Sequence, residues 1–274
     1  MKIGVIGTGN MGSILIEAMI TSEAVSPEDM IITNRTLAKA LLLQKNHPGL
    51  VVKRDAADVV QEADVIFICL KPLDIYPLLE EIKDQLRETQ IIISITSPIS
   101  VEQLEAHLSA KVVRMIPSIT NRALSGPTLW TFGKRITEED RRALLDFSTL
   151  FSQPVEISEP ITRIASDITS CGPAFITYLL ERLIEAAVEE TDIDRKTAVQ
   201  LATKMMIGYG KLLEKNLYTL DELRKKVHVK GGVTGEGLKV LEEEAGELFH
   251  HVIQKTHAKF YEDQREVDRH FAKD

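Results

Sequence analysis

Residues 2–12 read KIGVIGTGNMG, and this stretch determines the fold that the sequence predicts. Its apolar run from Ile3 to Ile6 predicts a short buried strand, and the apolar residues that recur from Ile14 to Met19 predict a helix. Between them lies a G-x-G-x-x-G pattern, formed by Gly7, Thr8, Gly9, Asn10, Met11 and Gly12. A strand, this pattern and a helix in that order are typical of a dinucleotide-binding turn.

The three glycines of the pattern have different expected roles. Gly7 permits a tight turn at the end of the strand, Gly9 lets a pyrophosphate approach the backbone, and Gly12 allows the helix to pack closely. The helix N-terminus adds free N–H groups and a partial positive charge. We therefore expect residues 7–12 to contact a dinucleotide. The alternative is a glycine-rich turn in an α/β domain without a ligand.

The composition narrows the class of protein. A chain of 274 residues with 44% hydrophobic and 27% charged residues is typical of a water-soluble protein with two domains. The net charge of −8 argues against a nucleic-acid surface, and no apolar run approaches the roughly 20 residues that span a bilayer. The N-terminus has no signal-peptide pattern, and Cys69 and Cys171 suggest neither a disulfide framework nor a metal site. These features favour a cytoplasmic enzyme.

The end of the second predicted strand indicates which cofactor is bound. This strand covers residues 30–33 and is followed by Asn34, Arg35 and Thr36. An acidic residue here would accept a hydrogen bond from the adenosine ribose 2′-OH and repel a 2′-phosphate, whereas Arg35 offers a planar cation suited to phosphate. We therefore expect NADP(H), with Asn34 and Arg35 as ligands and NAD(H) as the alternative cofactor. Arg35 as a solvated surface cation is the other interpretation.

The first half of the chain alternates strands and helices, which predicts a doubly wound parallel sheet of the Rossmann type. Further strands are expected at residues 51–52, 65–70, 90–96, 111–116 and 128–132, with helices at 55–63, 75–86, 101–108 and 138–151. The strand at 65–70 ends at Lys71 and Pro72. Because ligands bind beyond the carboxyl ends of such strands, we expect these two residues at the cofactor. A Lys71 that is merely solvated is the alternative.

The second half predicts only helices, at residues 167–190, 195–214, 220–227, 237–245 and 247–271, with a glycine-rich break at 230–235. We therefore divide the chain into a dinucleotide-binding domain at residues 1–158 and a helical domain at 159–274. Helices with so little core of their own suggest packing against a second subunit, as a homodimer or a larger homo-oligomer.

Three passages carry a family resemblance. They are GVIGTGNMG with Asn34-Arg35 and Lys71-Pro72; residues 113–118 with Gly126 and Thr128; and a C-terminal set of residues 170–175, Glu181, 223–224, 231–238 and 241–242. In this order they resemble the pyrroline-5-carboxylate reductases, which make proline by NAD(P)H-dependent reduction of a cyclic imine. The resemblance implies a Rossmann domain followed by a helical dimerisation domain.

The chain departs from the family at its loops. The family reads R-x-M-P-N-T-P where residues 114–120 read RMIPSIT, and S-G-S-G-P-A-Y where residues 169–175 read TSCGPAF. The family loop S-P-G-G-T-T is VKGGVT at 229–234. The family's serine helps to hold the substrate carboxylate, so Val229 loses one charge-assisted hydrogen bond, worth about 1.5–3 kcal/mol. These departures indicate a divergent paralogue rather than the housekeeping enzyme.

The resemblance also implies roles for individual residues. Thr234 matches the threonine near the ring nitrogen and is expected to orient it, while Lys230 or the backbone amides hold the carboxylate. The substrate-binding residues that follow are Glu181, Gly231, Gly232, Val233 and Gly235. Glu181 either contacts the partner's loop or pairs with an arginine, and the whole loop could simply join two helices.

Other reactive side chains receive structural interpretations. Cys171 replaces a family serine and has no neighbouring histidine, so we expect a packing role. His250, His251 and His257 lie on a charged helix, and we expect no metal site. Arg114, at a strand end, is expected to fix nearby loops or to act catalytically.

Two functions from different classes remain. The first is NAD(P)H-dependent reduction of a small anionic cyclic imine, pyrroline-5-carboxylate or a close analogue. The second is a catalytically weak or inactive paralogue that uses its dinucleotide fold for regulation or partner binding. The glycine pattern and Thr234 favour the first, whereas Val229 and Val233 favour the second.

Overall fold

The computed structural model describes residues 1–272 and divides the chain into two compact units. The first unit comprises Met1–Cys171 together with the segment from Thr256 onward, and the second comprises Gly172–Lys255. The expected division at 158/159 stays a prediction; the first compact unit extends to Cys171 and also includes the segment from Thr256 onward.

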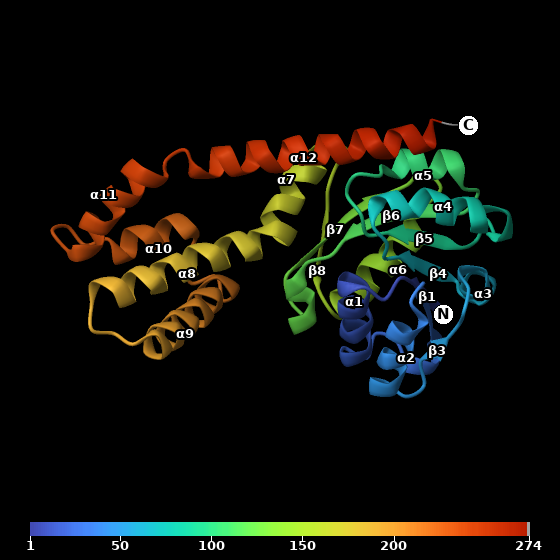
Figure 1. The fold of residues 1–274 in the computed structure, drawn as a ribbon, viewed down its shortest axis with the longest axis horizontal. Coiled ribbons are helices and arrows are strands. Elements are labelled where there is room, and N and C mark those ends of the chain that lie inside the picture. Colours follow the sequence, from blue (N-terminus) through green and yellow to red (C-terminus); the bar gives the residue numbers. More distant parts are fainter. Residues whose placement is uncertain (273–274) are drawn as a thin grey trace. The chain divides into compact units, whose positions relative to one another are not determined.

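An eight-stranded sheet forms the centre of the first unit (Figure 1). Its order is β3-β2-β1-β4-β5-β6-β7-β8. The strands are β1 Ile3–Ile6, β2 Met30–Thr33, β3 Val51–Val52, β4 Val65–Ile68, β5 Ile91–Ser94, β6 Lys111–Ile116, β7 Pro127–Phe132 and β8 Gln153–Glu156. Ile3 pairs with both Met30 and Val65 in parallel register, so β1 lies where the chain changes direction across the sheet. In α/β sheets this switch point is where ligands bind.

Helices cover both faces of this sheet and create two apolar cores (Figure 1). One core includes Leu15 of α1 and Leu144 of α6; the other includes Val59 of α3, Leu79 of α4 and Leu104 of α5. The helices are α1 Asn10–Thr21, α2 Leu37–Asn46, α3 Ala56–Glu62, α4 Pro72–Ile82, α5 Val101–His107 and α6 Glu138–Thr149, with short 3-10 turns at η1 Pro27–Asp29, η2 Lys83–Gln85, η3 Ile119–Ala123 and η4 Glu159–Ile161. Strands that are buried on both faces explain the continuous apolar runs of the sequence.

The second unit contains α8 Gly172–Glu190, α9 Arg195–Glu214, α10 Leu220–Val227 and α11 Val233–Ala245, while α12 Leu248–Phe271 runs from this unit into the first. Sequence caps set several starts: Asp194 accepts from the Thr197 amide, and Thr219 and Glu222 form a capping box. The predicted bounds of α9 and α10 are therefore confirmed.

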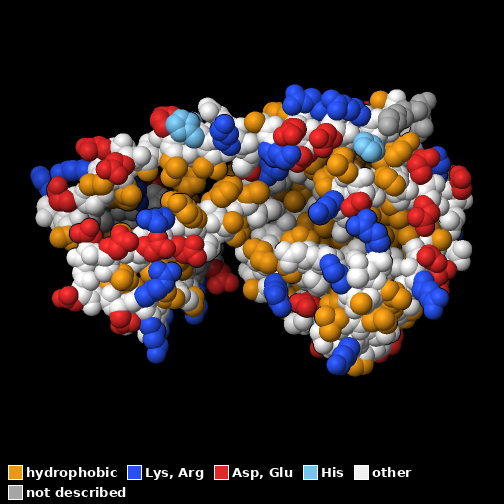
Figure 2. Space-filling model, viewed as in Figure 1, with side chains coloured by type: hydrophobic (Ala, Val, Ile, Leu, Met, Phe, Trp, Pro, Cys, Tyr) orange, Lys and Arg blue, Asp and Glu red, His pale blue; other side chains and the backbone are white. Residues whose placement is uncertain are grey.

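The second unit buries few side chains on its own. Ile184 and Ala198 are the buried residues of α8 and α9, while apolar side chains such as Tyr178, Leu183 and Met205 are about half exposed or more. Figure 2 shows hydrophobic side chains at the surface of these helices. Contiguous exposed apolar surface is typical of an interaction face.

Several predictions required correction. β7 runs antiparallel to β6, β8 was not predicted as a strand, and α2 was not predicted at all. The predicted helix at 167–190 consists of a π-helical turn (η5, Asp167–Cys171) followed by α8, with α7 Thr162–Ser166 before it. α11 begins at Val233, so Thr234 and Gly235 belong to its first turn rather than to the glycine-rich break.

Candidate functional site

The glycine-rich turn between β1 and α1 has little room for side chains at two of its three glycines. Gly7 has a φ of +103°, and a Cβ there would lie 2.5 Å from the Cys69 carbonyl oxygen. A Cβ on Gly12 would overlap the carbonyl oxygen of Gly7. A Cβ on Gly9 would meet no atom within 4 Å, so the turn is open at this residue. The structure thus confirms the predicted turn and close packing, and leaves space beside Gly9 for a ligand.

Asn34 fixes this turn from the neighbouring strand end. Its Oδ1 accepts a hydrogen bond from the Thr8 amide at 2.9 Å, and its Nδ2 donates to the Thr36 carbonyl at 3.0 Å. The Gly7 amide donates to the Thr33 carbonyl at 2.9 Å. The Asn34 side chain therefore organises the turn through its backbone, a role that the sequence alone does not indicate.

Two further features of the turn are able to bind a ligand. The Thr8 hydroxyl is buried with no hydrogen-bond partner among the described residues. α1 begins after Gly9 without a side-chain cap, and Asn10 and Met11 form its first turn. An uncapped helix N-terminus offers N–H donors to an anion. The open space at Gly9, the unpaired hydroxyl and these amides fit the phosphates of a dinucleotide.

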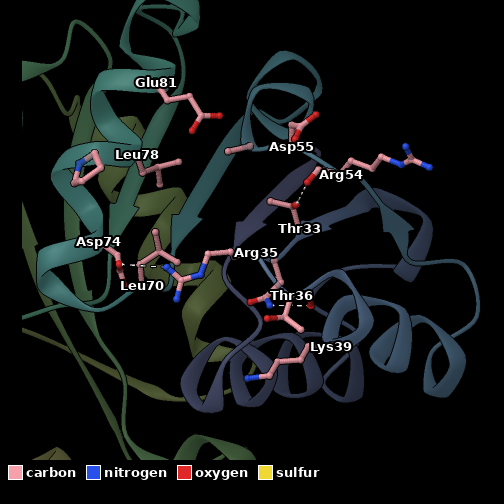
Figure 3. Close-up of a pocket in the computed structure, with 13 residues that line it drawn as sticks. Thr33, Arg35, Thr36, Lys39, Arg54, Asp55, Leu70, Asp74, Leu78 and Glu81 are labelled. Carbon is pink, nitrogen blue, oxygen red and sulfur yellow. Dashed lines mark hydrogen bonds and ion pairs between the residues drawn. The ribbon is translucent and has the colours of Figure 1, made fainter.

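A cavity of about 570 Å³ adjoins this turn at the end of β2. Figure 3 shows its lining residues. They are Thr33, Asn34, Arg35, Thr36, Lys39, Arg54, Asp55, Ala56, Leu70, Asp74, Pro77, Leu78 and Glu81. The predicted residues Asn34 and Arg35 thus lie together. The cavity also contains the nearby Lys39, and the fold adds one more cation (Arg54) and three acids (Asp55, Asp74, Glu81) from further along the chain.

Lys71 and Pro72 lie at the carboxyl end of β4, where Lys71 precedes α4 and Pro72 is its first residue. The Lys71 side chain is exposed. Cys69 is partly buried and packs against one of the apolar cores, and burial raises the pKa of its thiol to about 12.

The segment after β6 is ordered despite its departures from the family pattern. Ser118 and Asn121 cap η3 reciprocally, and the buried Asn121 also donates to the carbonyl of Ser125 at 3.0 Å. Ser118 Oγ donates to the Thr169 carbonyl and Ser170 Oγ to the Pro117 carbonyl, both at 2.8 Å. The π-helical turn is therefore tied directly to the end of β6.

Arg114 has a structural role in this arrangement. Its fully buried side chain forms a two-point ion pair with Glu159, with both N–O distances 2.8 Å, and donates to Thr162 Oγ1 at 2.5 Å. These bonds join β6 to η4 and α7. A buried guanidinium needs such partners because desolvation of its charge is costly.

The predicted substrate residues lie in the second unit. Gly231 has a φ of +76°, Gly232 precedes α11, and Thr234 lies in the first turn of that helix. Thr234 also lines a largely apolar cavity of about 710 Å³, together with Met205, Gly208, Tyr209, Leu212, Leu220, Leu223, Arg224, Val227 and Leu238. Val233 is 90% exposed, Lys230 is exposed, and Glu181 is exposed on α8.

A second cavity of about 370 Å³ lies beside the same turn. The imidazole of His228 packs against Gly235, whose Cβ would lie 2.8 Å from Nε2. Cations dominate the lining, which comprises Arg224, Lys225, His228, Gly235, Leu238, Lys239 and Glu242. Of this lining, the sequence predicts only Gly235 as a substrate residue; the cations Arg224, Lys225 and Lys239 are additional to the predicted Lys230.

Among residues 1–272, no cluster of histidine, cysteine and acidic side chains could hold a metal ion. Instead, His257 Nε2 lies 3.5 Å from Oδ2 of the buried Asp167, whose carboxylate also accepts hydrogen bonds from Arg163 and Thr256, each at 2.8 Å.

Burial raises the pKa of the Cys171 thiol. None of the described helices is long and apolar enough to cross a membrane.

The fold and the glycine turn define a Rossmann-type domain, and comparisons with known proteins identify its family. Residues 2–98 match the family model "NADP oxidoreductase coenzyme F420-dependent", and residues 159–263 match "Pyrroline-5-carboxylate reductase dimerisation". The chain is 30% identical to the pyrroline-5-carboxylate reductase of Methanosarcina acetivorans, over 88% of this chain and 90% of that protein. It therefore belongs to the pyrroline-5-carboxylate reductase family.

Two further relatives place the chain within this family. It is 51% identical to ComE operon protein 4 of Bacillus subtilis over 99% of both chains, which confirms the expected similarity to a divergent paralogue. The structure of a pyrroline-5-carboxylate reductase from Coxiella burnetii matches with a TM-score of 0.83 and 25% identity, over 97% of this chain and 98% of that one. Family and fold support a nicotinamide dinucleotide cofactor and an oligomer built through the dimerisation domain.

Proposed function

We propose that this protein reduces the C=N bond of a small cyclic imine that carries a carboxylate, pyrroline-5-carboxylate or a close analogue, with NADPH as the hydride donor. The observation that carries the proposal is the open, uncapped turn at Gly9, held by Asn34, in a chain that keeps Thr234 in the first turn of α11. The nicotinamide supplies the hydride when it is bound.

The protein's own task in this reaction is to position the imine and exclude water. The Thr234 hydroxyl is proposed to orient the ring nitrogen. Since Val229 cannot donate to a carboxylate, the amides of the first turn of α11 and the Lys230 cation are proposed to hold that group. Glu181 is proposed to contact this turn from a partner subunit. The exposed apolar side chains of the second unit support a homodimer.

The test is NADPH oxidation by the purified protein with pyrroline-5-carboxylate, with Thr234→Val and Thr234→Ser as a matched pair. Valine has the shape of threonine without its hydroxyl, whereas serine keeps the hydroxyl. We expect kcat/KM to fall at least about tenfold in the valine variant and to remain within about threefold in the serine variant. Equal losses in both variants would assign Thr234 a packing role.

A Val229→Ser variant tests the carboxylate contact. If serine restores a charge-assisted hydrogen bond worth about 1.5–3 kcal/mol, KM falls at least about tenfold. A gain confined to this variant would mean that the wild-type loop holds the carboxylate poorly.

A second candidate function has its own observation. Val229 and Val233 are 65% and 90% exposed beside Thr234, where they offer apolar surface rather than hydroxyl donors. This surface supports a paralogue that binds the dinucleotide but acts through a partner. The outcome that favours it is NADPH binding without turnover in the wild type and in Val229→Ser.

A further inference from the structure

Two residues of opposite charge meet in the cavity at the end of β2. Arg35 follows β2, and Asp74 lies in the first turn of α4. Arg35 Nη1 and Asp74 Oδ1 are 3.6 Å apart. Figure 3 shows the guanidinium extending toward that carboxylate. The cation that the sequence assigns to a 2′-phosphate thus already has an anion beside it.

The other charged residues of the cavity do not give it a net positive charge that would favour phosphate. Three cations (Arg35, Lys39, Arg54) and three acids (Asp55, Asp74, Glu81) line it, so its formal charge is zero. In Figure 3 the guanidinium of Arg54 points away from Arg35. A cavity with this composition is less selective for a phosphorylated ribose than its arginine alone predicts.

We propose that Asp74 is a specificity-determining residue that competes with the ribose 2′-phosphate for Arg35 and thereby narrows the preference for NADPH over NADH. This inference rests on the proposed function, because it assumes that the cavity receives the adenosine ribose. When a 2′-phosphate pairs with Arg35, the Asp74 carboxylate loses its partner and faces a group that carries about −1.5 to −2 charges. A ribose 2′-OH neither takes Arg35 from Asp74 nor places a charge beside that carboxylate. Dinucleotide folds use a carboxylate near the ribose to favour NAD.

The size of the effect follows from exposure. The side chains of Arg35 and Asp74 are 90% and 44% exposed, so solvent weakens both their attraction and the repulsion between Asp74 and phosphate. We therefore expect Asp74→Asn to improve binding of the phosphorylated ligand about three- to tenfold.

The experiment measures binding of 2′-phospho-ADP-ribose and of ADP-ribose to the full chain by titration calorimetry. These probes lack nicotinamide, so the result does not depend on turnover. The variants are Asp74→Asn, Glu81→Gln, Arg35→Gln and the Arg35→Gln/Asp74→Asn double variant. Glu81→Gln is the matched control, because Glu81 is a carboxylate of the same cavity and helix.

We expect Asp74→Asn to raise the affinity for 2′-phospho-ADP-ribose about three- to tenfold, while the affinity for ADP-ribose changes less than about twofold. In the Arg35→Gln background this gain should shrink to about twofold or less, since the competition needs the arginine. Retained ADP-ribose binding shows that each variant is folded.

Three results overturn the inference. They are equal changes for both ligands in Asp74→Asn, the same gain in Glu81→Gln, and an undiminished gain without Arg35. If the wild type binds neither ligand, the dinucleotide site and the proposed function fail together with the inference. If the wild type binds both and the ratio of affinities does not respond to Asp74→Asn, the inference alone fails.

Discussion

Asn34 Oδ1 accepts a hydrogen bond from the Thr8 backbone amide at 2.9 Å, so the end of β2 holds the glycine-rich turn at the end of β1. The same side chain donates to the Thr36 carbonyl at 3.0 Å. One amide group therefore sets the distance between the turn and the cavity that contains Arg35. Through these two hydrogen bonds the Asn34 side chain can control how a dinucleotide fits.

Asn34→Ala removes both bonds and is expected to weaken NADPH binding at least about tenfold, because each bond contributes about 1 kcal/mol to the order of the turn. Asn34→Asp keeps the acceptor for the Thr8 amide but loses the donor to the Thr36 carbonyl and adds a negative charge near the phosphates. It should therefore weaken NADPH binding more than NADH binding. Titration calorimetry with both cofactors measures this. Unchanged NADPH affinity in Asn34→Ala would show that the turn does not depend on this residue.

Gly9→Ala and Gly12→Ala are expected to affect different properties, cofactor binding in the first variant and stability in the second. An alanine at residue 9 meets no atom within 4 Å, whereas one at residue 12 overlaps the Gly7 carbonyl. We expect Gly12→Ala to cost at least about 3 kcal/mol and to lower Tm by about 6–12 °C. Gly9→Ala should keep Tm within about 4 °C and lose NADPH affinity at least about tenfold. Thermal unfolding and cofactor titration check the two arms, and a stable, cofactor-binding Gly12→Ala would contradict the geometry.

The ion pair between the buried Arg114 and the half-exposed Glu159 is expected to stabilise the first unit. Glu159→Gln leaves the buried guanidinium opposite a neutral amide; because solvent reaches Glu159, we expect a cost of about 1–2 kcal/mol. Glu138→Gln is the control, because Glu138 pairs with Arg141 at the surface and its loss should cost less than about 0.5 kcal/mol. Urea unfolding can be followed by fluorescence of the buried Trp130, the single tryptophan of the chain, which lies in the first unit. Equal costs would mean that solvent screens the Arg114–Glu159 pair as fully as the surface pair.

Asp140 should make stability depend on pH in the acid range. Burial opposes its ionised form, but hydrogen bonds from Lys111 and Thr137 outweigh that effect and lower the pKa of the Asp140 carboxyl. A lowered folded-state pKa gives stability that is fully present above the unfolded value, near 3.8, and is lost as the pH falls through the folded value. At neutral pH the free energy of unfolding of the wild type should therefore exceed that of Asp140→Asn by a constant amount. This difference should shrink below about pH 4. Chemical unfolding across pH measures this, with the exposed Asp146→Asn as the control.

The sequence predicted the elements whose signals are local. α9 and α10 have the predicted bounds because caps at Asp194 and Thr219 and a helical period mark them within a few residues. The apolar run of β4 likewise marks a strand that is buried on both faces. Local chemistry was sufficient in these places, and the fold class followed from their order.

Features that depend on distant partners could not be predicted. β8 consists of Gln153–Glu156, includes a proline and is mostly exposed, so only pairing with β7 identifies it as a strand. At the candidate site, the residues next to Arg35 in the sequence include no acid. Asp74 and Glu81 reach the same cavity from α4, about forty residues further along the chain. The charge of a site is set by every element that borders it.

The last part of α12 has a consequence for how the chain is built. Val267 is 1% exposed within the core that also holds Val59 and Leu79, and Gln103 Nε2 donates to Asp268 Oδ1 at 2.7 Å. In topological terms, residues 172–255 are an insertion within the dinucleotide-binding unit. During synthesis on the ribosome, one face of that unit lacks a core side chain until the whole helical insertion has been translated. The core that contains Val267 can therefore be completed only after the helical insertion has been translated.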